Sequence, residues 1–154
     1  MSRNNISDTG LKHLSLALKG NKGVKFLNLG SNKIKEEGME EFVDLLSTNT
    51  VIEELSLGGN NISNDGIAAF AKFLDKNSTL LHLDLAKNAF ADPGFDHFAK
   101  ALGNNCGIKF LDISKNKDLS DEGSLITLAD ALVLNKSLRK IDVTGLQIRK
   151  PYLK

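Results

Sequence analysis

Short runs of alternating apolar residues recur along the chain, and a stretch with helical spacing follows each of them. Leu27 and Leu29 alternate across a polar residue, which predicts a half-buried β-strand. Met39, Phe42 and Leu46 follow at i, i+3 and i+7, which predicts an amphipathic helix. Two later segments repeat this stripe, with the residues Ile67, Phe70, Leu74, Phe95, Phe98 and Leu102. The pattern therefore predicts several similar units, each made of one strand and one helix.

An asparagine and a glycine repeat with the same period along most of the chain. The asparagines are spaced 28 residues apart, at Asn4, Asn32, Asn60, Asn88 and Asn116. The glycines follow at the same spacing and then once after 29 residues, at Gly10, Gly38, Gly66, Gly94 and Gly123. A fixed period of this length is typical of a solenoid of stacked repeats. We therefore expect a single domain over residues 1–154, with a partial first unit at 1–23, units at 24–51, 52–79, 80–107 and 108–137, and a truncated last unit at 138–154.

Residues that favour the start of a helix stand just before the repeated glycines. N-cap positions suit Ser7 and Ser63, together with the acidic or amide residues that follow them. At such a position a side-chain oxygen accepts a hydrogen bond from a backbone N–H of the first turn. Ser120 and Asp121 offer the same chemistry, and Pro93 suits the first turn of a helix. We therefore expect a helix to begin near each glycine.

The pattern L-x-x-L-x-L-x-x-N-x-[IL]-x-x-x-G recurs in residues 24–38, 52–66 and 80–94 with aliphatic or Phe exchanges, and it resembles the leucine-rich repeat family. It is similar to the ribonuclease-inhibitor-like type, which has an α-helix in each unit. The resemblance implies an α/β fold. That fold is a right-handed leucine-rich-repeat solenoid with about five parallel strands on the concave face and α-helices on the convex face.

The repeated asparagine ends each strand, where the chain must turn sharply. Such a turn leaves backbone N–H and C=O groups buried and outside the sheet, and a side-chain amide has both donors and an acceptor for them. Leaving a buried backbone group unpaired costs about 1–3 kcal/mol. We therefore expect a structural ladder of stacked amides inside the solenoid, formed by Asn32, Asn60, Asn88 and Asn116.

Charge and cysteine content narrow the functional classes. The formal net charge of +1 gives no support to binding of nucleic acid or of a membrane surface. The first ten residues contain no apolar stretch that would serve as a secretory signal, and no apolar run approaches the ~18 residues that span a membrane. The single cysteine, Cys106, cannot form an internal disulfide, which favours a reducing compartment. We expect a cytoplasmic protein.

The residues that could carry chemistry do not converge. His13, His82 and His97 fall in different units, and the helix positions of His13 and His97 are expected to face solvent. The repeat holds no His or Asp near Cys106, so we expect a half-buried structural thiol there. No nucleophile, base and orienting group come together in the predicted fold. We therefore expect no enzyme activity, no cofactor and no metal site.

The side chains between the inward leucines point to the concave face and form columns across the strands. One column contains Phe26, Glu54, His82, Phe110 and Lys140, and the next contains Asn28, Ser56, Asp84, Asp112 and Asp142. Adjacent strands lie about 4.8 Å apart, and like charges at that separation repel unless they are paired. Large exposed aromatic residues are typical of binding hot spots. We therefore expect a partner-binding face formed by Phe26, His82, Asp84, Phe110, Asp112, Lys140 and Asp142.

Two less specific interpretations of this face stay open. Solvent and Lys140 could be enough to compensate the negative charges of Asp84, Asp112 and Asp142. The rings of Phe26 and Phe110 could simply cover gaps on a narrow sheet. A third column, which begins with Gly30 and Gly58, is almost bare, so the backbone of a partner could approach there.

Together these features predict a non-catalytic protein-binding scaffold that uses its concave face. The sequence does not identify the protein partner. Three alternatives stay open. The unit type resembles that of the Ran GTPase-activating protein, which implies a regulator of a GTPase. It also resembles the repeats of nucleotide-binding immune receptors, which implies a repeat fragment of a larger sensor. The five units and the N-x-[ST]-L connections resemble tropomodulin, which implies an actin-binding protein.

The C-terminal end has the strand of a further unit but no helix to complete it. Lys140 to Val143 would form an open edge strand beside an apolar layer, which is a recognised route to association. Residues 146–154 could instead fold back as a lid with Tyr152 and Leu153 inward, although the proline and lysines of this segment make a poor lid. We therefore expect a weak homodimer through the C-terminal edge.

Overall fold

Helices and strands alternate along the computed structural model, which describes residues 1–119 and 122–146. The helices are α1 (Asp8–Leu18), α2 (Glu36–Thr48), α3 (Asn64–Leu74), α4 (Asp92–Asn104) and α5 (Glu122–Leu134). The strands are β1 (Phe26–Asn28), β2 (Glu54–Ser56), β3 (His82–Asp84), β4 (Phe110–Asp112) and β5 (Lys140–Asp142). The expected cap at Ser120 and Asp121 and residues 147–154 of the alternative lid lie outside the described residues.

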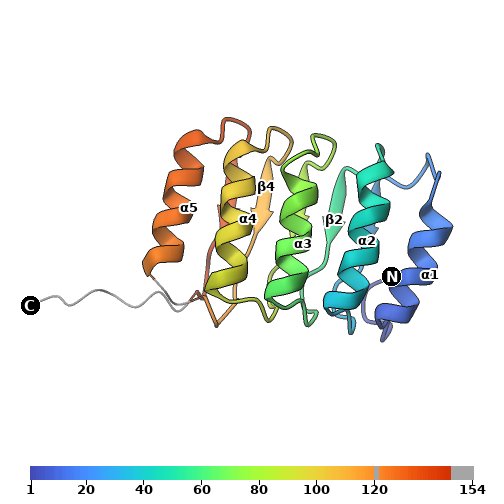
Figure 1. The fold of residues 1–154 in the computed structure, drawn as a ribbon. Helices are drawn as coiled ribbons and strands as arrows, with labels where there is room; N and C mark the ends of the chain where they lie inside the picture. Colours follow the sequence, from blue (N-terminus) through green and yellow to red (C-terminus); the bar gives the residue numbers. More distant parts are fainter. Residues whose placement is uncertain (120–121, 147–154) are drawn as a thin grey trace, which may run out of the picture.

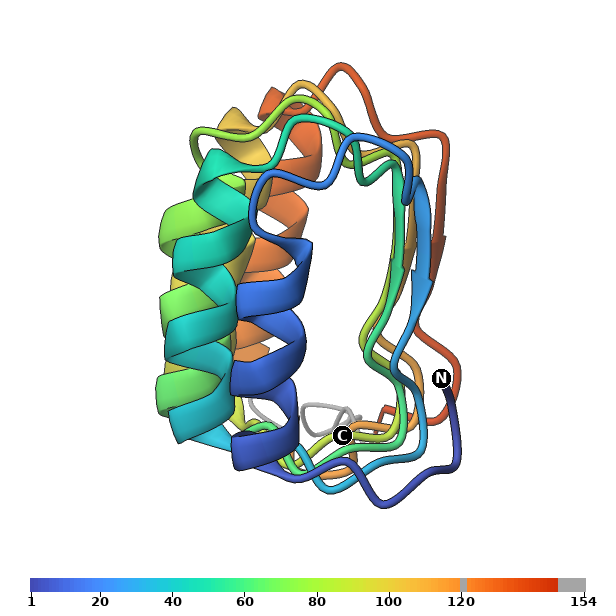
Figure 2. The ribbon, with the colours of Figure 1, turned by 90° about the vertical axis from the view of Figure 1, so that its right-hand side faces the viewer.

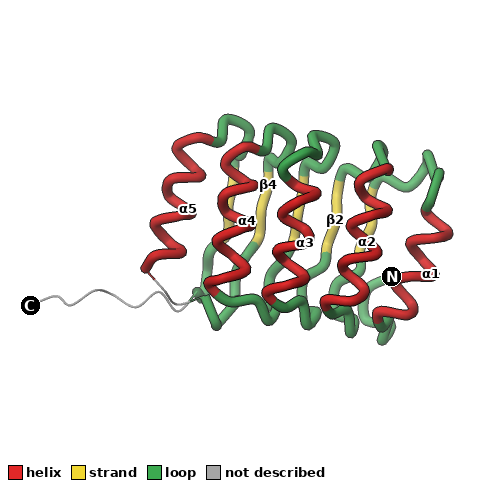
Figure 3. Tube along the Cα trace, viewed as in Figure 1, coloured by secondary structure: helices red, strands yellow, loops and turns green. Residues whose placement is uncertain are grey.

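The molecule has two layers. The five strands form one parallel sheet in the order β1-β2-β3-β4-β5. Figure 1 shows the helices side by side in a row, and Figure 3 shows the loops that join the two layers. In the view along the row, all helices lie on one side and all strands on the other (Figure 2). The predicted α/β solenoid is confirmed.

The strands pair in the register that the sequence predicts, with the first three pairings following the 28-residue period and the last one two residues longer. Phe26 pairs with Glu54, Glu54 with His82, and His82 with Phe110, which in turn pairs with Lys140. The last residue of each strand forms a second row, Asn28, Ser56, Asp84, Asp112 and Asp142. The middle residue of each strand points inward, toward the helices. The columns expected on the concave face are therefore present.

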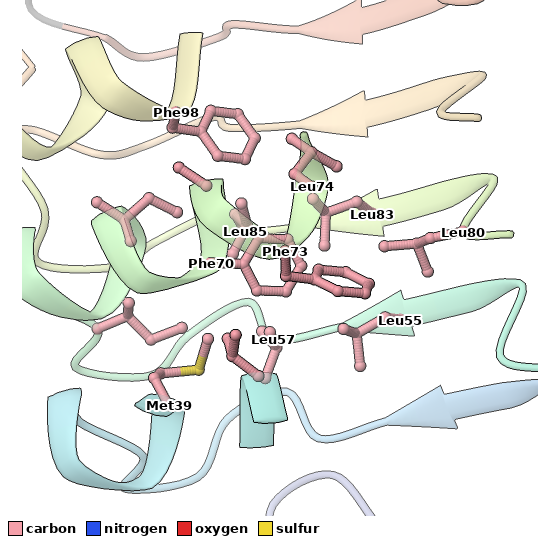
Figure 4. Packing of buried hydrophobic residues seen from close by; sticks show 14 of the residues in the cluster. Met39, Leu55, Leu57, Phe70, Phe73, Leu74, Leu80, Leu83, Leu85 and Phe98 are labelled. Atoms are coloured by element: carbon pink, nitrogen blue, oxygen red, sulfur yellow. The ribbon is translucent and has the colours of Figure 1, made fainter. Parts of the chain in front are cut away.

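The core fills the space between the two layers. All nine residues of the helical stripes that include Met39, Phe70 and Phe98 are buried. Figure 4 shows Leu55 and Leu83 of the strands on one side of this cluster and Phe70 and Leu74 of α3 on the other. Burying a side chain of this size contributes roughly 1.5–3 kcal/mol. The alternation of the strands and the stripes of the helices therefore meet in one continuous core.

The starts of the helices differ from the expectation. Ser7 and Ser63 do stand at the N-cap positions of α1 and α3, but neither side chain makes a capping hydrogen bond. Instead, Asn64 Oδ1 accepts a hydrogen bond of 2.8 Å from the backbone N–H of Ala91, the residue before α4. Asp8 Oδ1 accepts an equivalent bond of 2.8 Å from Lys35 in the next unit. The polar residue after each serine therefore caps the following helix, because successive helices begin side by side.

Candidate functional site

The first column of the concave face presents aromatic side chains to solvent. Phe26 is 65% exposed and Phe110 is 42% exposed. The ring of His82 meets the ring of Phe110 edge to face, with centroids 4.5 Å apart and planes at 71°. His82 Nδ1 also lies 3.2 Å from Glu54 Oε1. Glu54, His82 and Phe110 therefore form one connected row across β2, β3 and β4, with Phe26 standing by itself at one end.

The acidic column has a structural role that the sequence interpretation missed. Oδ1 of Asp84 accepts a hydrogen bond of 3.0 Å from the N–H of Ala86, two residues further along. The same local bond recurs at the equivalent positions of three other units, for Asn28, Asp112 and Asp142. Asn and Asp are suited to this bond, which stabilises a turn after the strand. An Asn or Asp followed two residues later by a small residue is the sequence signal for it.

The carboxylates in this column are therefore partly compensated within the chain. Ser56, which lacks the local bond, donates its hydroxyl to Oδ2 of Asp84 at 2.7 Å. The hydroxyl and the N–H of Thr144 hold the pKa of Asp142 below its ordinary value of 3.8, with smaller effects from the charges of Lys140 and Lys115. Local hydrogen bonds contribute more to this shift than Lys140, which the sequence interpretation named as the compensating charge.

A hollow opens on the concave face over β1, β2 and β3. Its volume is about 240 Å³. The polar and aromatic residues that line it are Phe26, Asn28, Glu54, Ser56, His82 and Asp84. Ser56 occupies the middle strand between larger neighbours, so its short side chain leaves space above the sheet. The walls combine one exposed phenyl ring with the carboxylates of Glu54 and Asp84, a combination that suits a cationic side chain.

A second, wider hollow of about 370 Å³ lies where the strands end. Arg3, Lys87 and Lys115 line it and have positive φ values of 58°, 53° and 59°. The third column forms its floor, and there a Cβ on Gly58 would lie 2.7 Å from Oδ1 of Asp84. The bare glycine therefore makes room for the neighbouring carboxylate. Across the third column, the basic residues Arg3, Lys87 and Lys115 therefore lie on the other side from Asp84 and Asp112.

The repeated asparagines lie inside the turns that support the face. Asn60 Nδ2 donates to the carbonyl oxygens of Leu57 and Leu29, at 2.8 and 3.0 Å, and Asn60 Oδ1 accepts from the N–H of Ile34 at 3.1 Å. Asn116 makes equivalent donor bonds, to Ile113 and Leu85. Each amide joins backbone groups of two neighbouring units.

A second set of asparagines forms a similar set of bonds at the other end of the units, where the helices end. Asn105 Nδ2 donates to the carbonyl oxygens of Leu74 and Asn77, both at 2.7 Å, and its Oδ1 accepts from Gly107 and Ile108. The period of these asparagines is visible in the sequence, but the sequence interpretation gave them no role.

The remaining candidate residues stand apart from one another. His13 and His97 are exposed on α1 and α4. The expectation of a half-buried Cys106 is wrong, because the thiol residue is exposed between the buried Asn105 and Gly107. Within residues 1–119 and 122–146, no three His, Cys, Asp or Glu side chains gather as metal ligands would. No helix in these ranges has both the length and the apolar character needed to cross a membrane.

Known proteins resemble this chain in sequence pattern and in fold. A family model described as a leucine-rich repeat matches residues 20–43, 48–71 and 76–96. A solved structure of leiomodin-1 actin-binding site 2 (ABS2) is similar at a TM-score of 0.77 and 21% identity, over 86% of this chain and 76% of that chain. The tropomodulin C-terminal domain of Caenorhabditis elegans is similar at a TM-score of 0.77 and 14% identity, over 87% of this chain and 82% of that chain.

No curated protein sequence matches the chain significantly. At 21% and 14% identity the two structures show a common fold and nothing finer. The family model does not name the ribonuclease-inhibitor-like type, so that subtype stays a prediction.

Proposed function

Since the chain belongs to the leucine-rich repeat family, we propose that it binds a protein partner through its concave face and catalyses no reaction. The observation that carries this proposal is the exposure of Phe26, at 65%, beside a hollow of about 240 Å³. A large aromatic side chain exposed beside a hollow is typical of a binding hot spot, which favours a partner that covers it. Under this proposal the protein works in the cytoplasm, where the exposed Cys106 would stay reduced.

The hollow is suited to an arginine side chain of the partner. A guanidinium group can stack on the ring of Phe26 while it donates hydrogen bonds to a carboxylate of Glu54 or Asp84. Glu54 keeps one oxygen free of the contact between its Oε1 and His82. Each carboxylate oxygen of Asp84 accepts one hydrogen bond within the chain, and each can accept a second. The partner is therefore expected to present a basic, extended or loop segment.

The size of the face sets an upper limit on affinity. Five strands about 4.8 Å apart make a face only about 20 Å long. Three outward positions on each strand give about fifteen side chains, against roughly 20–30 on each side of a standard interface. The proposed site residues, Phe26, His82, Asp84, Phe110, Asp112, Lys140 and Asp142, are expected to contribute most of the binding energy. We expect binding by a single copy to be weak.

Two variants of the hollow test the proposal, each with a matched control elsewhere. Glu54→Lys places a positive charge in the hollow, and Glu37→Lys makes the same change on the exposed surface of α2. Phe26→Ala removes the exposed ring, and Leu16→Ala removes a side chain of α1 that is 63% exposed. The partner is first recovered from cytosol with the unchanged protein, and its affinity for each variant is then measured by calorimetry. We expect each hollow variant to weaken binding by about tenfold or more, as the loss of a hot spot does.

The control variants show whether the partner binds at the hollow or elsewhere on the surface. Both control proteins are expected to bind as the unchanged protein does. Equal affinity for Glu54→Lys, Phe26→Ala and the unchanged protein would move the binding site away from the hollow.

Actin is a second candidate partner, because one of the similar structures is an actin-binding site of leiomodin-1. Calorimetry with monomeric actin and co-sedimentation with filaments test this candidate directly. Binding that Glu54→Lys weakens and Glu37→Lys leaves unchanged would support actin as the partner of the concave face. A GTP-hydrolysis assay with the recovered partner tests the alternative of a GTPase regulator.

A further inference from the structure

Helix α5 is apolar on more sides than its contact with α4 requires. The side that meets α4 includes the buried Ser124 and Ala131, and the Ser124 hydroxyl donates to Oδ1 of Asp96 at 2.9 Å. Ile126 and Val133 lie seven residues apart on the opposite side of the helix. They are 57% and 70% exposed. A helix that is apolar on all sides is normally buried, so this side of α5 is suited to a covering partner.

Large apolar side chains gather at this end of the solenoid and form what we call the C-terminal end face. It consists of Leu125, Ile126, Leu132, Val133 and Val143, all of which are exposed. Figure 1 shows α5 at the end of the row, with no further helix beyond it among the residues described. At the opposite end, α1 exposes one large apolar side chain, Leu16. The end helix α5 therefore exposes more apolar surface than the end helix α1 does.

The edge strand β5 has backbone groups that face away from the sheet. The N–H of Lys140 donates to the carbonyl of Lys109 at 3.0 Å, and the carbonyl of Asp142 accepts from Ile113 at 3.0 Å. Lys140 and Asp142 therefore turn their backbone groups toward β4. Because successive residues of a strand turn to alternate sides, the N–H and C=O of Ile141 point away from β4, to an edge where the described residues place no further strand. Such an edge is a template for another strand.

The sequence Lys-Ile-Asp of β5 complements itself when two copies run antiparallel. If Ile141 lies opposite the partner's Ile141, then Lys140 lies opposite the partner's Asp142, and Asp142 lies opposite the partner's Lys140. Directly opposite side chains have Cβ atoms about 4.5–5.5 Å apart, where opposite charges attract. The same two-fold axis sets α5 antiparallel to the partner's α5, apolar side to apolar side. The charge pattern of the edge therefore favours a second copy of this chain as the occupant.

We propose that this protein forms a symmetric dimer through the C-terminal end face. β5 pairs antiparallel with the partner's β5 around Ile141, and each Ile141 exchanges two backbone hydrogen bonds with the other. Ile126 and Val133 are covered by the same residues of the second copy. The two sheets join into one, with both rows of helices on the same side.

The test compares the oligomeric state of the full chain and four variants by light scattering and sedimentation over a hundredfold range of concentration. Val133→Glu puts a charge into the end face, and Leu16→Glu makes a similar change at the opposite end. Lys140→Asp sets like charges against each other across the two-fold axis. The double variant Lys140→Asp/Asp142→Lys reverses both charges and restores two opposite-charge pairs. Thermal unfolding of each variant checks that it folds.

We expect the unchanged protein to show a concentration-dependent dimer. Val133→Glu and Lys140→Asp are expected to raise the dissociation constant by about tenfold or more, while Leu16→Glu leaves it unchanged and the double variant restores it. Two results would overturn the proposal. A monomer at every concentration means that something other than a second copy covers the end face. A dimer that Lys140→Asp and Val133→Glu do not weaken means that the copies join elsewhere.

Discussion

At the end of the strand in each of the four complete units, one side-chain amide joins the backbone of two neighbouring units. Asn32 Nδ2 donates to the carbonyl of Leu29 at 2.8 Å, and Asn32 Oδ1 accepts from the N–H groups of Asn4 and Ile6 at 3.0 and 2.9 Å. A carboxylate at the same place would offer no donor, and a serine hydroxyl would offer one donor instead of two. The amide therefore holds the sharp turn after each strand, and with it the direction in which the concave side chains point.

Replacing one of these amides tests how much the ladder contributes. We expect Asn60→Ala to lower the free energy of unfolding by roughly 2–3 kcal/mol, because it leaves the buried N–H of Ile34 unpaired and removes one of the two amide donors at the carbonyls of Leu29 and Leu57. The matched control is Asn61→Ala, because Asn61 is the exposed neighbour in the same turn. Its effect should stay within about 0.5 kcal/mol. Urea unfolding measures both, and equally small effects would contradict the ladder as a source of stability.

At the scale of elements, the sequence predicts what lies within one unit better than what joins two units. The stripes through Met39 and Phe70 predicted the buried sides of α2 and α3, because burial of such a stripe depends only on helical geometry. Asn64 was expected to help cap its own helix, yet it caps Ala91 of the next unit. That bond depends on the spacing between helices, which no local pattern contains.

The same limit applies to the candidate site. The register that aligns His82 with Phe110 follows from the 28-residue period, and the strand pairing confirms it. The hydrogen bond from Ala86 to Asp84 was missed, because it depends on how the chain turns after the strand. Neither the strand register nor this hydrogen bond tests whether the concave side chains bind a partner. Partner binding at these residues stays a proposal.

The repeated glycine explains the close spacing of the helices and gives a prediction at this scale. A Cβ on Gly94 would lie 2.6 Å from the Cα of Asn64, and one on Gly66 would lie 3.5 Å from the Cα of Glu36. We expect Gly94→Ala to destabilise the protein by roughly 1–3 kcal/mol, because backbone would have to move. Gly66→Ala meets mainly the side chain of Ile62, and the gain of about 1 kcal/mol in helix propensity should offset much of its cost. Thermal unfolding compares the stability of the two variants. A larger loss of stability for Gly66→Ala than for Gly94→Ala would contradict the proposed role of the close contact between Gly94 and Asn64.

At the scale of the whole molecule, the two proposed surfaces have different roles: the concave face binds a partner, and the C-terminal end face joins two copies of the chain. One copy offers about fifteen outward side chains, fewer than the roughly 20–30 of a standard interface. In the proposed dimer the two sheets continue one another, so the two concave faces form one surface of about twice that number. Dimerisation would therefore bring the concave face to the size that a stable complex requires. The C-terminal end face, although distant from the hollow, would then set the affinity for a large partner.

Amide hydrogen exchange at two protein concentrations tests this arrangement residue by residue. The N–H of Ile141 points to the open edge in a single copy, so it should exchange quickly when the protein is dilute. In the dimer it donates to the partner strand, and we expect its exchange to slow by about tenfold at concentrations well above the dissociation constant. The amides of α5 should gain protection with it. Those of α1, at the far end of the row, should keep the same rates, because nothing covers them in the dimer. Equal slowing at α1 and β5 would indicate general aggregation, and no change at Ile141 would contradict pairing through β5.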